Sequence, residues 1–181
     1  MHEPAFWRVR DLKSRHSAPI LRMLLTPVSA IYEWGGARRI AKATPHDAGV
    51  PIICIGNLTV GGSGKTPLTT HLREILVEKG IQAATLSRGY GGTLKGPLKV
   101  DPTTVIASEV GDEPLMMACS GESWIGRDRI AAAEAMKANG VEVILMDDGH
   151  QNPSLAKDLS LIVIDAAAPF GNGHVLPKGP L

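Results

Sequence analysis

A glycine-rich hexapeptide, Gly-Gly-Ser-Gly-Lys-Thr at residues 61–66, constrains this chain more than any other feature of its sequence. It follows a short apolar run at residues 50–55, which is typical of a buried parallel strand, and it precedes a helical pattern over residues 65–79. Glycines let successive backbone N–H groups curl around phosphate oxygens, and the following helix adds its positive end. The sequence therefore predicts a phosphate-binding P-loop.

Each residue of the predicted loop has an expected role. Lys65 is expected to reach the β- and γ-phosphates of ATP, and the hydroxyl of Thr66 is expected to bind Mg²⁺. Two neighbours depart from the general pattern, because Thr59 replaces a glycine and Val60 replaces a lysine common in related ATPases. The alternative is an ordinary glycine-rich turn between a strand and a helix. The predicted nucleotide-binding residues are Thr59, Val60, Gly61, Gly62, Ser63, Gly64, Lys65 and Thr66.

Strand and helix patterns alternate after the loop. Strands are expected at residues 81–86, 123–125, 141–146 and 159–164, and helices at residues 112–119 and 129–138. This order predicts an α/β fold of the P-loop NTPase type, with a mostly parallel sheet and helices on both faces. We expect two parts: a basic, amphipathic helical segment over residues 1–45, and a P-loop ATP-binding α/β domain over residues 46–181.

Carboxylates stand where a P-loop protein needs them. Asp147 and Asp148 end an apolar strand, so one is predicted to hold Mg²⁺, directly or through water, and the other to tune the metal or the nucleophile. We assign the metal to Asp147 and a catalytic role to Asp148, beside Lys65. Asp112 is a candidate base for the proton of an acceptor hydroxyl. The plain alternative is that these residues form turns and cap helices.

Four side chains are weaker candidates for substrate contact. Arg88 and Tyr90 lie in a glycine-rich loop after the second predicted strand, at the ligand-binding edge of such a sheet. Glu113 follows the candidate base, and Arg129 begins a predicted helix. A turn with exposed side chains is the competing interpretation.

Residues 19–34 carry an apolar stripe with a period near 3.6. Cations and Trp34 flank the stripe, which suits a helix in a membrane interface. Packing on the protein's own core is the alternative, and the pattern by itself favours that alternative. No stretch resembles a signal peptide or reaches the length that spans a bilayer, so a cytoplasmic body is expected.

Charge and cysteine usage narrow the class of protein. The net charge is +1 overall, +4 over residues 1–50 and −3 over the remainder, which gives no case for nucleic-acid binding. Hydrophobic residues make up 44% of the chain and charged residues 20%, enough for a true core. Cys54 and Cys119 have no Cys-x-x-Cys partner and are expected to be buried free thiols.

Taken in order, these segments resemble the tetraacyldisaccharide 4′-kinase (lipid A 4′-kinase) family. The matching segments are residues 56–67, 86–91, 110–114, 147–152, 170–173 and 176–181, preceded by the amphipathic helix. The departures at Thr59 and Val60 are normal in this family. The resemblance also favours membrane contact for residues 19–34, which reverses the preference from pattern alone.

The resemblance implies a peripheral enzyme on the cytoplasmic face of the bacterial inner membrane. It would use ATP and Mg²⁺ to phosphorylate the 4′-hydroxyl of tetraacyldisaccharide 1-phosphate, giving lipid IVA in lipid A biosynthesis. It assigns proton removal to Asp112 and the Mg²⁺ site to Asp147 and Asp148.

Family members are roughly twice as long as this chain. They continue with a second lobe where this sequence stops, so weak or no kinase activity is expected of the 181 residues alone. A P-loop ATPase switch, a small-molecule ligase and an inactive kinase lobe remain as alternatives.

Overall fold

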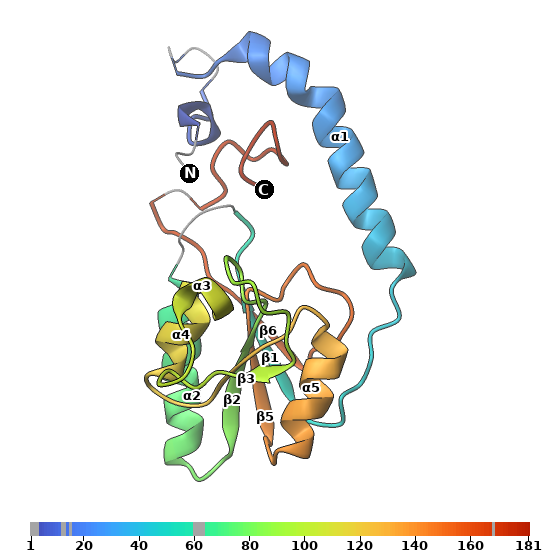
Figure 1. The fold of residues 1–181 in the computed structure, drawn as a ribbon. Coiled ribbons are helices and arrows are strands. Elements are labelled where there is room, and N and C mark those ends of the chain that lie inside the picture. Colours follow the sequence, from blue (N-terminus) through green and yellow to red (C-terminus); the bar gives the residue numbers. More distant parts are fainter. Residues whose placement is uncertain (1–3, 12–13, 15, 60–63, 168) are drawn as a thin grey trace. The chain divides into compact units, whose positions relative to one another are not determined.

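The computed structural model describes residues 4–11, 14, 16–59, 64–167 and 169–181 (Figure 1). The chain divides into two compact units. The sheet unit comprises Thr44–Gly56 and Gly64–Ile162, and the terminal unit comprises Met1–Ala43, Asn57–Ser63 and Val163–Leu181.

The sheet unit is built on a six-stranded sheet with the order β3-β4-β2-β5-β1-β6. All neighbouring strands are parallel except β3 and β4, so the predicted mostly parallel α/β fold is confirmed. The short edge strand β3 was not expected from the sequence. The strands are β1 (Ile52–Gly56), β2 (Ala83–Ser87), β3 (Leu98–Lys99), β4 (Ser123–Ile125), β5 (Val143–Asp147) and β6 (Leu159–Ile162).

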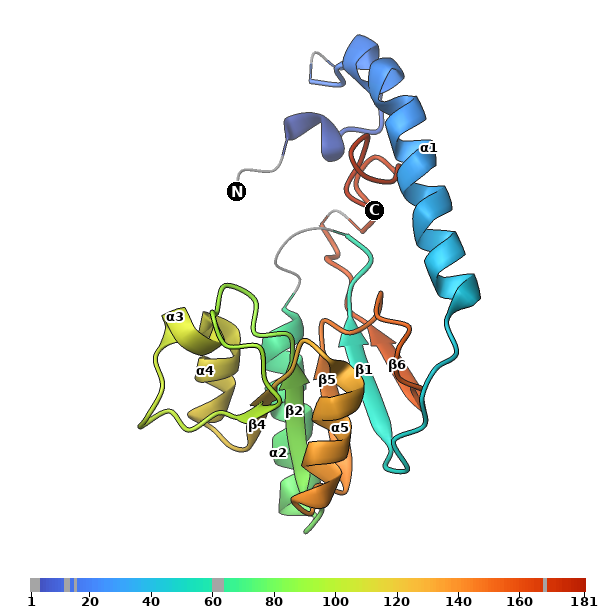
Figure 2. The ribbon, with the colours of Figure 1, turned by 45° about the vertical axis from the view of Figure 1, so that its right-hand side comes forward.

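Helices cover both faces of this sheet (Figures 1 and 2). Helix α5 packs on one face, where Ala132 and Met136 join Ile144 and Met146 in the main apolar core. Helices α2 and α4 contact each other and cover the other face. Their bounds are α2 (Lys65–Glu78), α3 (Ala107–Val110), α4 (Asp112–Ala118) and α5 (Arg129–Ala138).

The two cysteines have different environments. Cys54 lies in the centre of β1 and is fully buried, as expected. The expectation that Cys119 is buried was wrong, because this residue is exposed. Cys119 is the C-cap of α4. Burial of a strand residue in a parallel sheet follows from its place in the sheet, whereas a helix end has no such guarantee.

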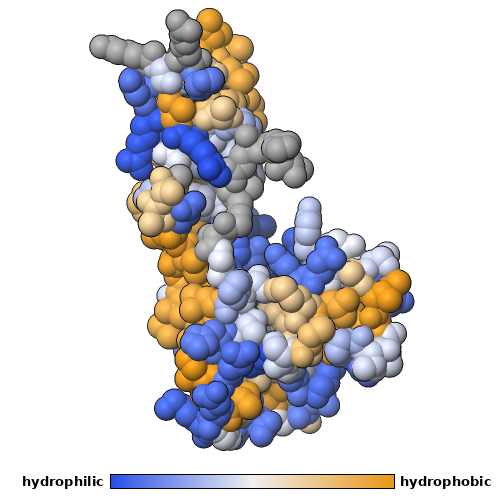
Figure 3. Space-filling view, turned by 90° about the vertical axis from the view of Figure 1, so that its left-hand side faces the viewer, coloured by the Kyte–Doolittle hydropathy of each residue, from blue (hydrophilic) through white to orange (hydrophobic). Residues whose placement is uncertain are grey.

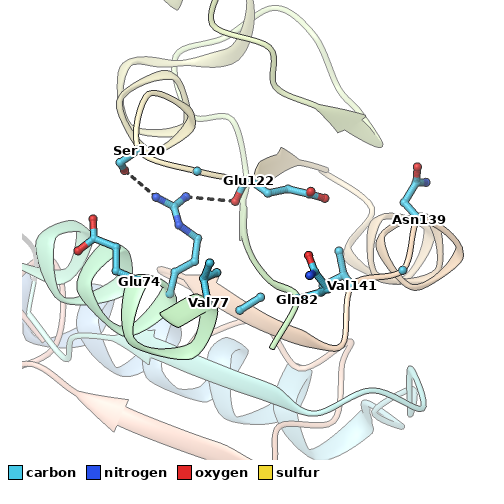
Figure 4. Close-up of a pocket in the computed structure, with 11 residues that line it drawn as sticks. Glu74, Val77, Gln82, Ser120, Glu122, Asn139 and Val141 are labelled. Carbon is cyan, nitrogen blue, oxygen red and sulfur yellow. Dashed lines mark hydrogen bonds between the residues drawn. The ribbon is translucent and has the colours of Figure 1, made fainter. Parts of the chain in front are cut away.

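A cavity of about 230 Å³ opens near the start of β2, at the edge of the sheet where the parallel strands begin (Figure 4). Arg73 of α2 is buried in its wall and donates to the carbonyl oxygens of Met117 and Glu122 and to Ser120 Oγ, at 2.6–3.1 Å. The guanidinium therefore ties α2 to the end of α4. A cation is favourable beside the last carbonyl oxygens of a helix. The burial of Arg73 is therefore accounted for by a structural role.

The terminal unit contains the short 3-10 helix η1 (Ala5–Trp7) and the long helix α1 (Pro19–Lys42), which runs further than the expected residues 19–34. Arg22 and Ser29 are the buried residues of α1. Ser29 Oγ donates to the carbonyl oxygen of Val175 and accepts from the backbone N–H of Lys178, both at 3.1 Å. Ser29 therefore ties α1 to the C-terminal segment.

The apolar stripe of α1 is exposed, and Figure 3 shows hydrophobic side chains gathered along this helix. Met23, Ile20 and Ile31 are 78%, 77% and 69% exposed. Most of the stripe is therefore left unburied within the terminal unit, and membrane contact of residues 19–34 stays a prediction. Among those residues, no helix is both long enough and apolar enough to cross a membrane.

Candidate active site

The candidate site lies where the first turn of α2 meets the end of β5. Parallel pairing sets Ile55 of β1 opposite Asp147 of β5, so the start of the loop that leads to α2 shares an edge with the carboxylates. Lys65 Nζ lies 3.5 Å from Asp148 Oδ1, and Thr66 Oγ1 donates to Asp147 Oδ2 at 3.5 Å. The structure thus brings Lys65, Thr66 and Asp147, which were expected to bind phosphate and metal, together with Asp148, which was expected to have a catalytic role.

Asp147 is buried, with 2% of its surface exposed. Burial raises the pKa of its carboxyl to about 6, and the negative charge of Glu113 acts in the same direction, while the hydroxyl of Thr69 opposes the rise. The group therefore needs a positive partner to stay ionised at little cost. A cation at this position would supply that partner.

Asp148 differs from its neighbour. It is exposed, and its backbone φ of +52° lies in the left-handed region, which non-glycine residues seldom adopt. Its N–H donates to the carbonyl oxygen of Ile55 at 2.9 Å, so the turn is held against β1. This conformation directs the Asp148 side chain toward Lys65.

Two arginines stand near the carboxylates. Arg129 is buried at the start of α5 and donates through Nη1 to the carbonyl oxygen of Gly126 at 2.9 Å. Burial lowers the pKa of its guanidinium to about 10 and the charge of Arg88 lowers it further, whereas Asp148 and Asp147 act against this. Two neighbouring guanidinium groups repel each other, and a polyanion such as a nucleotide phosphate would interact favourably with both.

Asp112 is the first residue of α4 and is exposed. Within the described part of the chain, its carboxylate makes no hydrogen bond or ion pair. Gly111 before it has a φ of +95°, and a Cβ there would collide with the carbonyl oxygen of Tyr90. This close approach sets Asp112 beside the Arg88–Tyr90 loop, with Tyr90 itself 85% exposed.

The structure describes only part of the predicted loop. Gly64 is the N-cap of α2, with a φ of +79°. Thr59 belongs to the terminal unit, where its carbonyl oxygen accepts from the side-chain amide of Asn57. The predictions for Val60, Gly61, Gly62 and Ser63 fall outside the described residues.

Two hydroxyl groups at the site were not expected from the sequence. Thr69, one turn after Thr66, donates to Asp147 Oδ1 at 3.2 Å, and its spacing on α2 was the available signal. Ser87 ends β2, and its buried Oγ finds no partner among the described residues. Strand alternation and register place it on the same side of the sheet as Asp147, so an unsatisfied hydroxyl faces the same region.

The donor set fits Mg²⁺. A hydroxyl at Thr66 and a carboxylate at Asp147 are oxygen ligands of the kind this ion prefers. In the described ranges, no three His, Cys, Asp or Glu residues gather in a way that would hold a metal alone. Mg²⁺ usually keeps several waters and binds substrate phosphates, so it needs few oxygen ligands from the protein.

Comparison with known proteins agrees with this geometry. Residues 21–181 match the profile of a family described as Tetraacyldisaccharide-1-P 4′-kinase. The chain belongs to this family. It is 62% identical to a protein named Tetraacyldisaccharide 4′-kinase from Hyphomonas neptunium and 53% identical to one of the same name from Maricaulis maris. Both alignments cover all of the chain but only 55% and 53% of the relatives, so the chain spans about half the length of these family members.

A solved structure of the same family has the same fold. It is the "apo" form of LpxK from Aquifex aeolicus in complex with ATP, with a TM-score of 0.74 and 32% sequence identity. The similarity covers 89% of this chain and 54% of the Aquifex chain.

Proposed function

We propose that this chain is the nucleotide-binding portion of a kinase that transfers the γ-phosphate of ATP to the 4′-hydroxyl of tetraacyldisaccharide 1-phosphate. One observation carries the proposal: Thr66 and Lys65 of α2 each contact one carboxylate of the Asp147–Asp148 pair. This is the arrangement a P-loop phosphotransferase needs to hold nucleotide and metal together. The names of the relatives and the ATP complex of the Aquifex protein support the choice of substrates.

Each polar group of the site has a task in this reaction. Lys65 binds the β- and γ-phosphates, while Thr66 and Asp147 hold Mg²⁺. The metal, when bound, neutralises charge on the phosphate oxygens. Asp148 holds Lys65 in place through their 3.5 Å contact. Arg129 and Arg88 add positive charge beside the transferred phosphate.

Asp112 acts on the acceptor. As the 4′-oxygen bonds to the γ-phosphorus and the bond to the ADP oxygen breaks, the hydroxyl proton passes to the Asp112 carboxylate. Its exposure and its lack of a partner within the described chain leave it available for this step. We assign contacts with the sugar to Tyr90 and Glu113, because the Tyr90 loop packs against Gly111 and Glu113 follows Asp112.

The substrate is a lipid, and α1 supplies a surface for it. Its exposed apolar side chains and its C-terminal cations, Arg39 and Lys42, suit a helix that lies in the interface of an anionic bilayer. We therefore propose that the protein is peripherally bound to the cytoplasmic face of the inner membrane. Nucleic acid is not a partner in this proposal.

The test is phosphate transfer by the protein as expressed from its gene. Vesicles that contain tetraacyldisaccharide 1-phosphate, Mg²⁺ and γ-labelled ATP should yield labelled lipid, and Lys65→Ala should abolish the label. ATP hydrolysis that is indifferent to the disaccharide would instead favour an ATPase switch and overturn the kinase assignment.

A further inference from the structure

Thr69 lies on α2, one turn beyond the residues expected to bind phosphate and metal. It is fully buried. Its Oγ1 lies 3.0 Å from the carbonyl oxygen of Lys65 and 3.2 Å from Asp147 Oδ1. A hydroxyl carries one hydrogen, so it donates to one of these acceptors at a time. Donation to an ionised carboxylate is the stronger of the two bonds.

The two oxygens of Asp147 therefore have different partners. Oδ2 faces the Thr66 hydroxyl at 3.5 Å, which is a long contact, while Oδ1 is held by Thr69 at the shorter distance of 3.2 Å. The terminal torsion of an aspartate is broad, so a carboxylate without a tether samples many orientations. A bond to Oδ1 restricts that torsion and leaves Oδ2 directed at Thr66.

We infer that Thr69 is a positioning residue, which holds Asp147 Oδ1 so that Oδ2 stays free for the metal beside Thr66. The inference rests on the proposed function, because it assumes that Asp147 binds the cation. Groups that orient a metal ligand from behind commonly change metal affinity by 10- to 100-fold when they are removed. Thr69 neither touches the metal nor reacts in this arrangement.

The chain offers variants that isolate the hydroxyl. Thr69→Val keeps the shape of the side chain and removes the donor, whereas Thr69→Ser keeps the donor. Thr85 supplies a matched control, since it is an equally buried threonine whose hydroxyl has only a 3.5 Å contact to the carbonyl oxygen of Glu122. Thr85→Val should therefore leave metal binding unchanged. Thr69→Ala serves as a second donor-free variant if the valine disturbs packing.

The readout is the Kd for Mn²⁺. It is measured by electron paramagnetic resonance on the intact protein in the presence of saturating ATP. Thr69→Val should raise the Kd for Mn²⁺ by about tenfold, and Thr69→Ser should stay within about threefold of the parent. The Kd for ATP in EDTA should not change in either variant. Parent-like Mn²⁺ binding by both Thr69→Val and Thr69→Ala would overturn the inference, as would an equal loss of metal-free ATP binding.

Asp147→Asn separates this inference from the function on which it rests. If this variant binds Mn²⁺ weakly while the donor-free Thr69 variants bind it normally, the inference fails and the metal site stands. If Asp147→Asn binds Mn²⁺ as the parent does, both the metal site and the inference fail.

Discussion

Lys65 Nζ and Asp148 Oδ1 lie 3.5 Å apart, although 82 positions separate the two residues along the sequence. The contact joins the first residue of α2 to the turn after β5. The Lys65 side chain is 16% exposed and that of Asp148 66%, so a ligand can reach this pair from solvent.

Removal of the Lys65 ammonium should weaken nucleotide binding directly. We expect Lys65→Ala to raise the Kd for MgATP at least tenfold, about 1.4 kcal/mol, because the phosphates lose their cationic partner. Titration calorimetry measures this change. Lys79→Ala, at the opposite end of α2, should bind like the parent. Equal affinities for the Lys65 variant and the parent would contradict the P-loop assignment.

The raised pKa of Asp147 predicts a dependence of stability on pH. The pKa of the carboxyl is about 3.8 in the unfolded chain and about 6 in the folded protein, so the native protein binds this proton more tightly. Stability of the metal-free protein should therefore fall as pH rises from about 4 to 6 and level off above. Asp147→Asn should remove this fall and be more stable at pH 7, by on the order of 1–3 kcal/mol. Urea unfolding in EDTA at several pH values measures both, and a parallel pH dependence in the two proteins would contradict the assignment of the shift to Asp147.

Gly111 should tolerate no side chain. Gly111→Ala places a Cβ against the Tyr90 carbonyl oxygen at a positive φ, and both effects are unfavourable. Gly140 has a similar φ of +84° but open space around it, so Gly140→Ala reports the backbone strain alone. We expect Gly140→Ala to cost about 1 kcal/mol and Gly111→Ala at least about 1 kcal/mol more. Comparable midpoints in urea for the two variants would contradict the close approach.

Arg73 should stabilise the sheet unit rather than serve a ligand. Arg73→Met removes three hydrogen bonds, but the Met117 and Glu122 carbonyl oxygens each keep a backbone partner. We therefore expect a loss of about 2 kcal/mol in the free energy of unfolding, with no change in ATP affinity. Arg127→Met, at an exposed arginine with one carbonyl contact, should cost less than about 1 kcal/mol. A change in ATP affinity in the Arg73 variant would contradict a purely structural role.

The exposed stripe of α1 should decide membrane association. Replacement of Leu24 and Ile31, which are 68% and 69% exposed, by glutamate should abolish binding to anionic vesicles in a flotation assay. The melting temperature should change little because neither side chain is buried. Glutamate at Thr26, an exposed polar position outside the apolar stripe, provides the control. Retention of vesicle binding by the Leu24–Ile31 variant would contradict the membrane proposal.

Much of the sheet unit could be predicted because its signals are local. The expected strand at residues 123–125 and helix at residues 129–138 coincide with β4 and α5. The structure adds that the Asp128 side chain accepts from the backbone N–H groups of Ile130 and Ala131, which fixes the start of α5 locally. The meeting of the P-loop with Asp147 also followed, because carboxyl ends of parallel strands share one edge. The two-residue strand β3 escaped prediction because it is too short to show a period.

The sequence by itself determined the α/β class, the residue types of the site and the order in which the chain presents them. Only the tertiary structure decided which contacts those residues make. The pattern of α1 shows an apolar and a polar stripe, but not that Arg22 and Ser29 lie on the buried side. Likewise, Thr69 looks like any helix residue until β5 brings Asp147 to its hydroxyl. Periodicity in the sequence shows which residues share one side of a helix or strand. The residues that this side contacts depend on how distant segments pack and in which register, and no local pattern specifies the packing or the register.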